Sequence, residues 1–427
     1  MSRRFVVAGM IVLSLVLSTM PLDYENILEQ DVVVKNANSE PQFLTHAGSN
    51  SGHVNASFIE PTIDGWIVAG ATRNSMQFGS SISETANSPL NNNYEADMYI
   101  AKIGDDGVWQ WANIPDASGG LIFLETLAPG QGGEYYVGGS FVGTVSFGPH
   151  SIQSPAFVLE GFIAKFDDVG NWLWATAYSS LNNGTSEVNG IAIDMQSGNV
   201  IASGSNSGET NFGSILINST DRDVNLVGID PISGNVNWAV SSGGIGSDFA
   251  GEVLVDKTGK VWQMAFTSAT FNGGGGNSHQ AVSNQDSLLV GWTPNSGGAA
   301  VSTVRAIPSG TSEVNIAESM TIDPSGDIYA TGVFVGTINL GGQKTVSTSG
   351  NDGDIFVVKM SPQTGFDWIV SVGSSSATEW GHSIAASDSG DLVVGGVYSG
   401  TTSFGGKYIT STGGQDGFMA QIDNSGN

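Results

Sequence analysis

Acidic turns and histidines are the residues of this chain that are best suited to chemistry. Turns such as Asp256–Lys260 and Asp323–Asp327 contain Asp and Gly, but a calcium loop needs several carboxylates at alternate positions and a closing Glu. The five histidines show no paired spacing of the kind that metal sites use. No nucleophile–base pair or phosphate-binding loop is evident either. We therefore expect no catalytic residue, no metal and no cofactor, and interpret the turns as hairpin turns.

The hexapeptide Gly-Thr-Ser-Glu-Val-Asn occurs twice and provides a candidate ligand face. It spans Gly184–Asn189 and Gly310–Asn315, on the loop that enters a predicted strand. Glu187 and Glu313 would lie on one face and attract a cation or a basic or hydroxylated partner. Duplication of a solvated loop accounts for the same pattern, so both interpretations stay open.

The elements that must position these residues come from an internal repeat. Six similar stretches each open with an acidic residue, at spacings of 63, 63, 63, 68 and 62 residues. These acidic residues are Asp97, Glu160, Asp223, Asp286, Asp354 and Asp416. A near-constant period of this length indicates a repeat architecture.

Each repeat is predicted to form four short strands. The first strand includes stretches such as Asn189–Asp194 and Glu318–Asp323, and the acidic residue opens the third strand. The fourth strand carries Val301 or one of four tryptophans, Trp111, Trp174, Trp238 and Trp368. Strands rich in β-branched and aromatic residues, separated by Asp-Gly and Ser-Gly turns, predict an all-β fold of antiparallel four-stranded blades.

Composition narrows the class of partner and the cellular location. The formal net charge is −27 with only 13 Lys and Arg, so the chain lacks the positive surface that nucleic acid requires. There is no cysteine, which excludes disulfides and thiolate sites. Residues 1–20 have the two arginines and the apolar run of a signal peptide, although an uncleaved anchor is an alternative. We expect a secreted or cell-surface protein with no membrane span after cleavage, an acidic linker at 21–41 and a repeat domain at 42–427.

The two ends of the repeat region predict a closed ring. The stretch after Pro41 matches the region that begins at Trp368, with Phe43 at the tryptophan position. Phe43–Ala47 would then supply the fourth strand of the last blade and pair with the strand around Phe418–Ile422, which predicts a closed six-bladed β-propeller. A truncated reading frame with further repeats remains an alternative.

The stretch Gly326–Gly373 resembles the SBBP repeats of bacterial and archaeal β-propellers. Its TGVFVGT corner, DIFVVK strand and tryptophan follow the order of that family, and the resemblance covers residues from about 43 to 427. Repeat four departs from it, with Val301 in place of tryptophan, so its blade is expected to be irregular. The resemblance implies a propeller on an exported protein and no defined reaction. A weaker resemblance joins Asp230–Trp238 to quinoprotein propeller repeats, in which the tryptophan docks against the neighbouring blade.

Taken together, these features favour a non-enzymatic binding or interaction module for a protein or glycan ligand. The alternatives are a carbohydrate-active hydrolase or lyase with its site at the mouth of a central channel, and a structural scaffold in an envelope assembly. Only the side chains around the axis could distinguish the enzyme from the other two.

Overall fold

The computed structural model describes residues 45–427, except for 49–53, 74, 89–96, 156–157, 183, 283, 296, 309–313, 349, 351 and 375–377. These residues form strands and turns without any helix, which confirms the predicted all-β class. Accordingly, this described part holds no helix that could cross a membrane. The predicted signal peptide and acidic linker lie outside the described residues, and Thr45–Asn427 forms one compact unit.

The first three repeats each form an antiparallel sheet in which the strands follow one another in chain order. Sheet 1 has the order β2–β3–β6–β7 (Phe58–Pro61, Gly65–Thr72, Asp97–Gly104, Trp109–Asn113). Sheet 2 has β8–β9–β11–β12 (Asp116–Pro129, Glu134–Phe147, Glu160–Asp167, Trp172–Ala177). Sheet 3 has β14–β15–β16–β17 (Thr185–Ile193, Val200–Phe212, Ile215–Ile229, Val236–Ser242), with β13 (Ser179–Ser180) also on β15.

The last three repeats follow the same plan. Sheet 4 has the order β18–β19–β22–β23 (Asp248–Val255, Val261–Thr267, Asp286–Asn295, Gly298–Ile307). The fourth repeat was expected to be irregular, but its strand order is that of its neighbours. Sheet 5 has β24–β25–β28–β29 (Val314–Ile322, Ile328–Val335, Asp354–Ser361, Gly365–Val372). Sheet 6 has the three described strands β30–β31–β34 (Glu379–Ala386, Leu392–Tyr398, Asp416–Ile422).

A small hairpin extends from each sheet between its second and third strands. In sheet 2 the hairpin is formed by the end of β9 and by β10 (His150–Gln153), and in sheet 3 by the long strands β15 and β16. In the other sheets it is a separate pair of strands: β4 and β5 (Ser75–Phe78, Ile82–Thr85), β20 and β21 (Thr270–Asn272, Ser278–Gln280), β26 and β27 (Thr337–Asn339, Thr345–Ser347), and β32 and β33 (Thr401–Phe404, Lys407–Thr410). Phe147, Phe212 and Phe271 come from these hairpins and are fully buried. The TGVFVGT corner noted in the sequence therefore leads from β25 into the hairpin of β26 and β27.

The strand predicted to close the last sheet has a different partner. Ala47 lies in β1 (Ala47–Gly48) and pairs with Phe78 of the first repeat, instead of the strand around Phe418–Ile422. The carbonyl of His46 holds this segment in place, because it accepts hydrogen bonds from Gly79 N (3.1 Å) and Trp109 Nε1 (3.2 Å). Phe43 and Leu44 lie outside the described residues. This part of the closure prediction is wrong.

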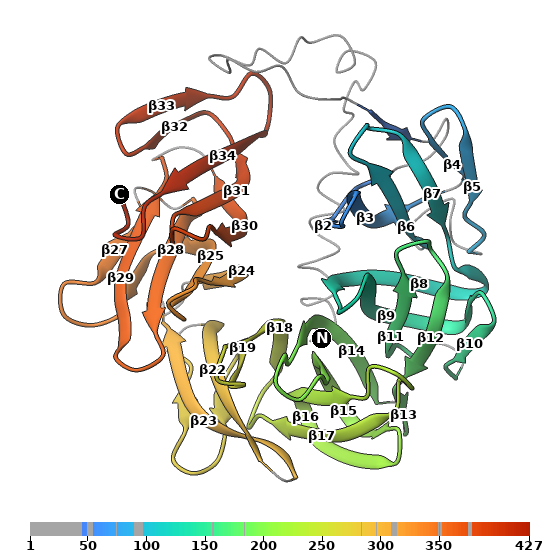
Figure 1. Cartoon of the computed structure of the whole chain (residues 1–427). Helices are drawn as coiled ribbons and strands as arrows, with labels where there is room; N and C mark the ends of the chain where they lie inside the picture. Colours follow the sequence, from blue (N-terminus) through green and yellow to red (C-terminus); the bar gives the residue numbers. More distant parts are fainter. Residues whose placement is uncertain are drawn as a thin grey trace. The chain divides into compact units, whose positions relative to one another are not determined.

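Successive sheets pack face to face, and the first strand of each sheet lies against the sheet before it. Thus β14 contacts β8, β9 and β11, and β30 contacts β24, β25 and β28. Figure 1 shows β14, β18, β24 and β30 on the sides of their sheets that face the centre of the view. The buried apolar side chains between neighbouring sheets form shared clusters, such as Ile163 with Ile191 and Leu289 with Met320. Burial of this surface is the main stabilising contribution to the fold.

Candidate functional site

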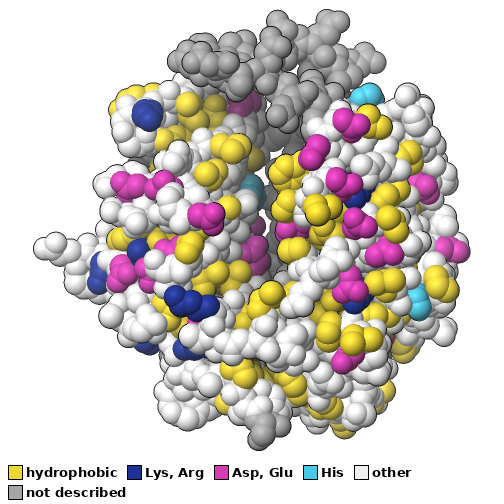
Figure 2. All heavy atoms as spheres, in the orientation of Figure 1, with side chains coloured by type: hydrophobic (Ala, Val, Ile, Leu, Met, Phe, Trp, Pro, Cys, Tyr) yellow, Lys and Arg dark blue, Asp and Glu magenta, His cyan; other side chains and the backbone are white. Residues whose placement is uncertain are grey.

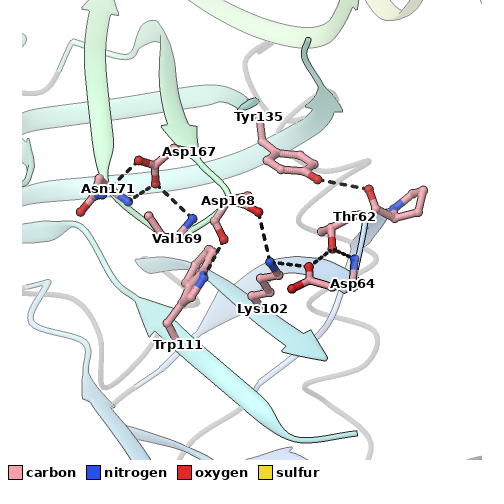
Figure 3. Close-up of polar contacts among 10 residues, drawn as sticks. Thr62, Asp64, Lys102, Trp111, Tyr135, Asp167, Asp168, Val169 and Asn171 are labelled. Carbon is pink, nitrogen blue, oxygen red and sulfur yellow. Dashed lines mark hydrogen bonds and ion pairs between the residues drawn. The ribbon is translucent and has the colours of Figure 1, made fainter. Parts of the chain in front are cut away.

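The tryptophans of the fourth strands dock on the neighbouring sheet, as the resemblance to quinoprotein repeats implied. The indole nitrogen of Trp111 donates to the carbonyl of Asp168 (3.0 Å), and that of Trp174 donates to Pro231 (3.1 Å). Trp368 donates in the same way to Asn424 (3.1 Å). Each acceptor lies in the turn between the third and fourth strand positions of the next sheet. These side chains therefore fasten one repeat to the next (Figure 3).

Trp238 and Val301, the remaining members of this set, are also packed. Trp238 is half-buried and lies against Gly298 of sheet 4, and Val301 is buried beside the hairpin residue Gly273. The fourth-strand position is therefore structural in all five of these repeats.

Lysines of the third strands strengthen two of these junctions. Lys102 Nζ lies 2.7 Å from Asp64 of its own sheet and 3.2 Å from Asp168 of the next one (Figure 3). Lys165 Nζ likewise contacts Glu134 (2.7 Å) and the carbonyl of Pro231 (2.7 Å). Each nearly buried ammonium group thus has at least one carboxylate to balance its charge and a hydrogen-bond acceptor from the next sheet.

The acidic residues that define the repeat have a structural role, because most of their carboxylates bind backbone amides at the ends of the strands. All six lie at or near the start of the third strands, and four of them accept hydrogen bonds from nearby backbone amides. The pairs include Ser88 N to Asp97 (3.0 Å), Ser180 N to Glu160 (2.9 Å), Val282 N to Asp286 (3.0 Å) and Thr412 N to Asp416 (2.8 Å). Asp354 is buried in the same position, and Asp223 lies in β16 with Ser242 and Gly243 beside it. Carboxylates that satisfy loop amides in this way hold the strand entrances in place.

Of the two residues in the candidate ligand face, only Glu187 lies within the described structure. Glu187 lies in β14, where its carboxylate forms a 2.7 Å ion pair with Arg222, and Arg222 also donates to Thr185 Oγ1 (3.1 Å). Glu187 therefore has a partner within its own sheet. Glu313 lies outside the described residues.

A more regular arrangement occupies the first strands. In sheets 2 to 6 the pairing of the first strand with the second contains a β-bulge at the same place in the strand, and sheet 2 has a second irregularity near the start of β8. The polar residues at these bulges are Glu125, Asn189, Glu252, Glu318 and His382, which we call the bulge row. Bulges re-aim side chains and are frequent beside functional sites. Because the first strands of successive sheets contact one another, the members of the row are neighbours in space.

Direct contacts link the later members of the row. His382 Nδ1 lies 3.6 Å from Glu318 Oε2, and its ring stacks on Trp380 with a centroid distance of 5.6 Å. Glu252 reaches the bulge of β24, where Oε2 accepts hydrogen bonds from Met320 N (2.7 Å) and Ser319 Oγ (3.4 Å). Glu318 and His382 are therefore in direct contact, and Glu252 reaches the strand that carries Glu318.

Two carboxyl groups of the row have strongly shifted protonation. Burial raises the pKa of Glu125 to about 8, and the charge of Glu187 adds to the shift. Burial also raises the pKa of Glu252 to about 7, although the hydrogen bonds from Met320 and Ser319 oppose the effect. Near neutral pH these groups therefore carry protons part of the time. A carboxyl group in this state both donates and accepts hydrogen bonds.

The surroundings of the row limit what it can bind. Within the described ranges, no group of three or more His, Asp or Glu side chains is arranged to hold a metal ion. Figure 2 shows acidic side chains spread over one face of the molecule, some along its central hollow, with few Lys and Arg among them. A polyanion such as nucleic acid would be repelled by this surface.

Comparisons with known proteins leave the function open. No protein-family model matches the chain, and no curated protein matches it. A solved polysaccharide lyase of family PL25, an ulvan lyase, is 11% identical with a TM-score of 0.43, over 86% of this chain and 92% of the lyase. A protein of unknown function from Bacteroides caccae is 12% identical with a TM-score of 0.38, over 78% and 88% of the two chains. Quinohemoprotein alcohol dehydrogenase from Comamonas testosteroni is 10% identical with a TM-score of 0.37, over 84% and 67%. With such values, function must be argued from the site itself.

Proposed function

We propose that the six sheets are blades of a β-propeller and that the chain is a secreted or cell-surface module that binds glycans through the bulge row. The observation that carries the proposal is the recurrence of a bulge at one position in five first strands, with a polar residue at each. Because bulges re-aim side chains and are frequent beside functional sites, this recurrence supports a binding role for these polar residues. The resemblance to SBBP repeats supports the propeller architecture and the exported location.

The protonation of the row favours hydroxyl groups over a cation as the ligand. Glu125 and Glu252 have raised pKa values because their surroundings disfavour the charged form. Sugar hydroxyls match such groups, since each hydroxyl donates and accepts one or more hydrogen bonds. Asn189, whose buried Oδ1 has no hydrogen bond within the described structure, offers a further acceptor.

A glycan array probed with the full chain tests this function. The Glu125→Ala/Glu318→Ala double variant removes two hydrogen-bonding side chains from the row, and Asp388→Ala removes an exposed side chain from a surface turn as the matched control. We expect the wild type and the control to retain at least one glycan class and the double variant to lose roughly tenfold or more in affinity, about 1.4 kcal/mol. Equal binding by all three proteins, or no binding by the wild type, would count against the proposal and favour a scaffold.

A carbohydrate-active enzyme is the second candidate, because of one specific pair. Glu318 Oε2 lies 3.6 Å from His382 Nδ1, which leaves Nε2 as the ring nitrogen that could accept a proton from a ligand. If the pair is catalytic, incubation with the retained polysaccharide should release new reducing ends, and His382→Gln should abolish the release while binding persists. Retention without any product over long incubation would exclude this candidate.

A further inference from the structure

The two terminal sheets each expose an apolar side chain at a position that is buried in every other described sheet. In the third strand, the residue three places after the repeat acid is 82% exposed in sheet 6, where it is Met419. The same position is between 0 and 1% exposed in sheets 1 to 5, where the residues are Ile100, Ile163, Leu226, Leu289 and Val357. The last sheet therefore presents an interior-type surface to solvent.

The first sheet shows the complementary exposure. Ile59 of β2 is 61% exposed. The residues with the same pairing in the first strands of the other sheets are between 4 and 7% exposed: Leu127, Ile191, Val253, Met320 and Ile384. Among the described residues, no preceding sheet covers sheet 1 on this side.

The interior junctions show which surface covers which. Ile100 shares an apolar cluster with Leu127 of the following sheet, and Leu226 shares one with Val253. Ile163 with Ile191, Leu289 with Met320 and Val357 with Ile384 repeat this relationship. In all five junctions, a residue of the Met419 type packs against a residue of the Ile59 type. A surface of one kind is therefore built to bind a surface of the other kind.

We propose that the face of sheet 6 around Met419 binds the face of sheet 1 around Ile59 of a second copy of this chain. Met419 and Ile59 are both exposed within the described part of one chain, so each copy offers a surface of both kinds. The contact is head-to-tail, which produces chains of copies or closed rings and not a two-fold dimer. This inference does not depend on what the bulge row binds.

The strength and salt dependence of the contact follow from its composition. Sheet 6 has no fourth strand among its described elements, so the contact lacks the tryptophan hydrogen bond of the Trp174 type. We therefore expect weak, concentration-dependent association. Copies of net charge −27 repel each other, and because salt screens this repulsion, association should strengthen as salt is added.

Sedimentation velocity with two charge variants tests the proposal. Ile59→Asp and Met419→Asp each spoil one of the two faces, and each variant alone should stay monomeric at concentrations where the wild type forms oligomers. An equimolar mixture has one intact face of each kind, so it should form dimers, with double the monomer mass, and nothing longer. Val169→Asp, at another exposed apolar residue, should associate like the wild type. A monomeric wild type at all concentrations, or a mixture that stays monomeric, would overturn the proposal.

The absence of cysteine allows a second test that does not rely on affinity. Ile59→Cys and Met419→Cys single variants, mixed and oxidised, should form disulfide-linked dimers containing one copy of each. Dimers of Met419→Cys alone would show symmetric edge pairing, and a bridge within one chain of the double variant would show closure of the ring instead. Either result would overturn the head-to-tail contact.

Discussion

The indole nitrogen of Trp174 lies 3.1 Å from the carbonyl oxygen of Pro231, a residue 57 positions away in the next sheet. Trp111 with Asp168 and Trp368 with Asn424 repeat this relationship. The acceptor turns contain a glycine with positive φ, such as Gly170 (φ 87°) beneath Trp111, where a Cβ atom would lie 3.0 Å from the ring. The repeat thus encodes both sides of the junction, the tryptophan and the turn that receives it.

Replacing Trp174 with alanine should destabilise the protein by about 3–5 kcal/mol, as expected for removal of a large buried side chain. Denaturant unfolding of the two proteins measures this difference. Leu173→Ala, at the exposed neighbouring residue on the same strand, should cost far less. Equal losses for both variants would show that the Trp174 side chain does not secure the junction.

Replacing Lys165 with methionine should cost about 1–3 kcal/mol, because the carbonyl of Pro231 and the carboxylate of Glu134 lose their common donor. Lys407→Met removes a charge of the same sign from an exposed position and should change the unfolding free energy by less than about 0.5 kcal/mol. The same unfolding experiment compares the two variants. An unchanged midpoint for Lys165→Met would mean that this lysine contributes no net stability.

The sequence allowed the repeat, the all-β class and the docking tryptophans to be predicted because each recurs at a fixed offset. Turn glycines, strand patterns and Trp174 carry their information locally. The pairing of Ala47 was predicted wrongly because the similarity of the Phe43 region to a fourth strand says nothing of competing partners. His46 decides that pairing through two hydrogen bonds to residues far along the chain.

The bulge row escaped sequence analysis for a different reason. A bulge changes the register by one residue, which depends on both strands, and the row contains three residue types at the shared position. The alignment of the first strands places Asn189 and Glu318 at the same position, but because Glu, Asn and His share no motif, nothing in the letters marks the position as a bulge. The signal would have been one residue in each first strand that has no pairing residue in the second strand. Only the strand pairing in the structure shows which residue that is.

The stability of the protein should fall as pH rises from about 4.5 to about 8. In the native state the pKa of Glu125 is about 8 and that of Glu252 about 7, compared with 4.5 for an unperturbed Glu. Above about pH 4.5 the native state therefore retains protons that the unfolded chain has lost. The contribution of these two groups to the free energy of unfolding is thus largest at low pH and falls as the pH rises toward their native pKa values. Urea unfolding midpoints between pH 5 and pH 9 measure the slope.

Glu125→Gln should reduce this slope from about pH 4.5 to about 8, and most completely between pH 7 and 8, where Glu252 no longer contributes. Asp388→Asn, at an exposed position, should leave the slope as it is in the wild type. If the stability of the Glu125→Gln variant instead falls with pH as steeply as that of the wild type, Glu125 is already ionised in the native state at neutral pH.

Isothermal titration of the best glycan from the array into the full chain tests most directly whether the bulge row is the binding site. The Glu318→Gln variant keeps the shape of the side chain but removes its charge and weakens its contact with His382. The account predicts that this change weakens binding roughly tenfold or more, about 1.4 kcal/mol, while Asp388→Asn binds like the wild type. Affinities that are the same for the wild type, Glu318→Gln and Asp388→Asn would place the glycan elsewhere and contradict the account.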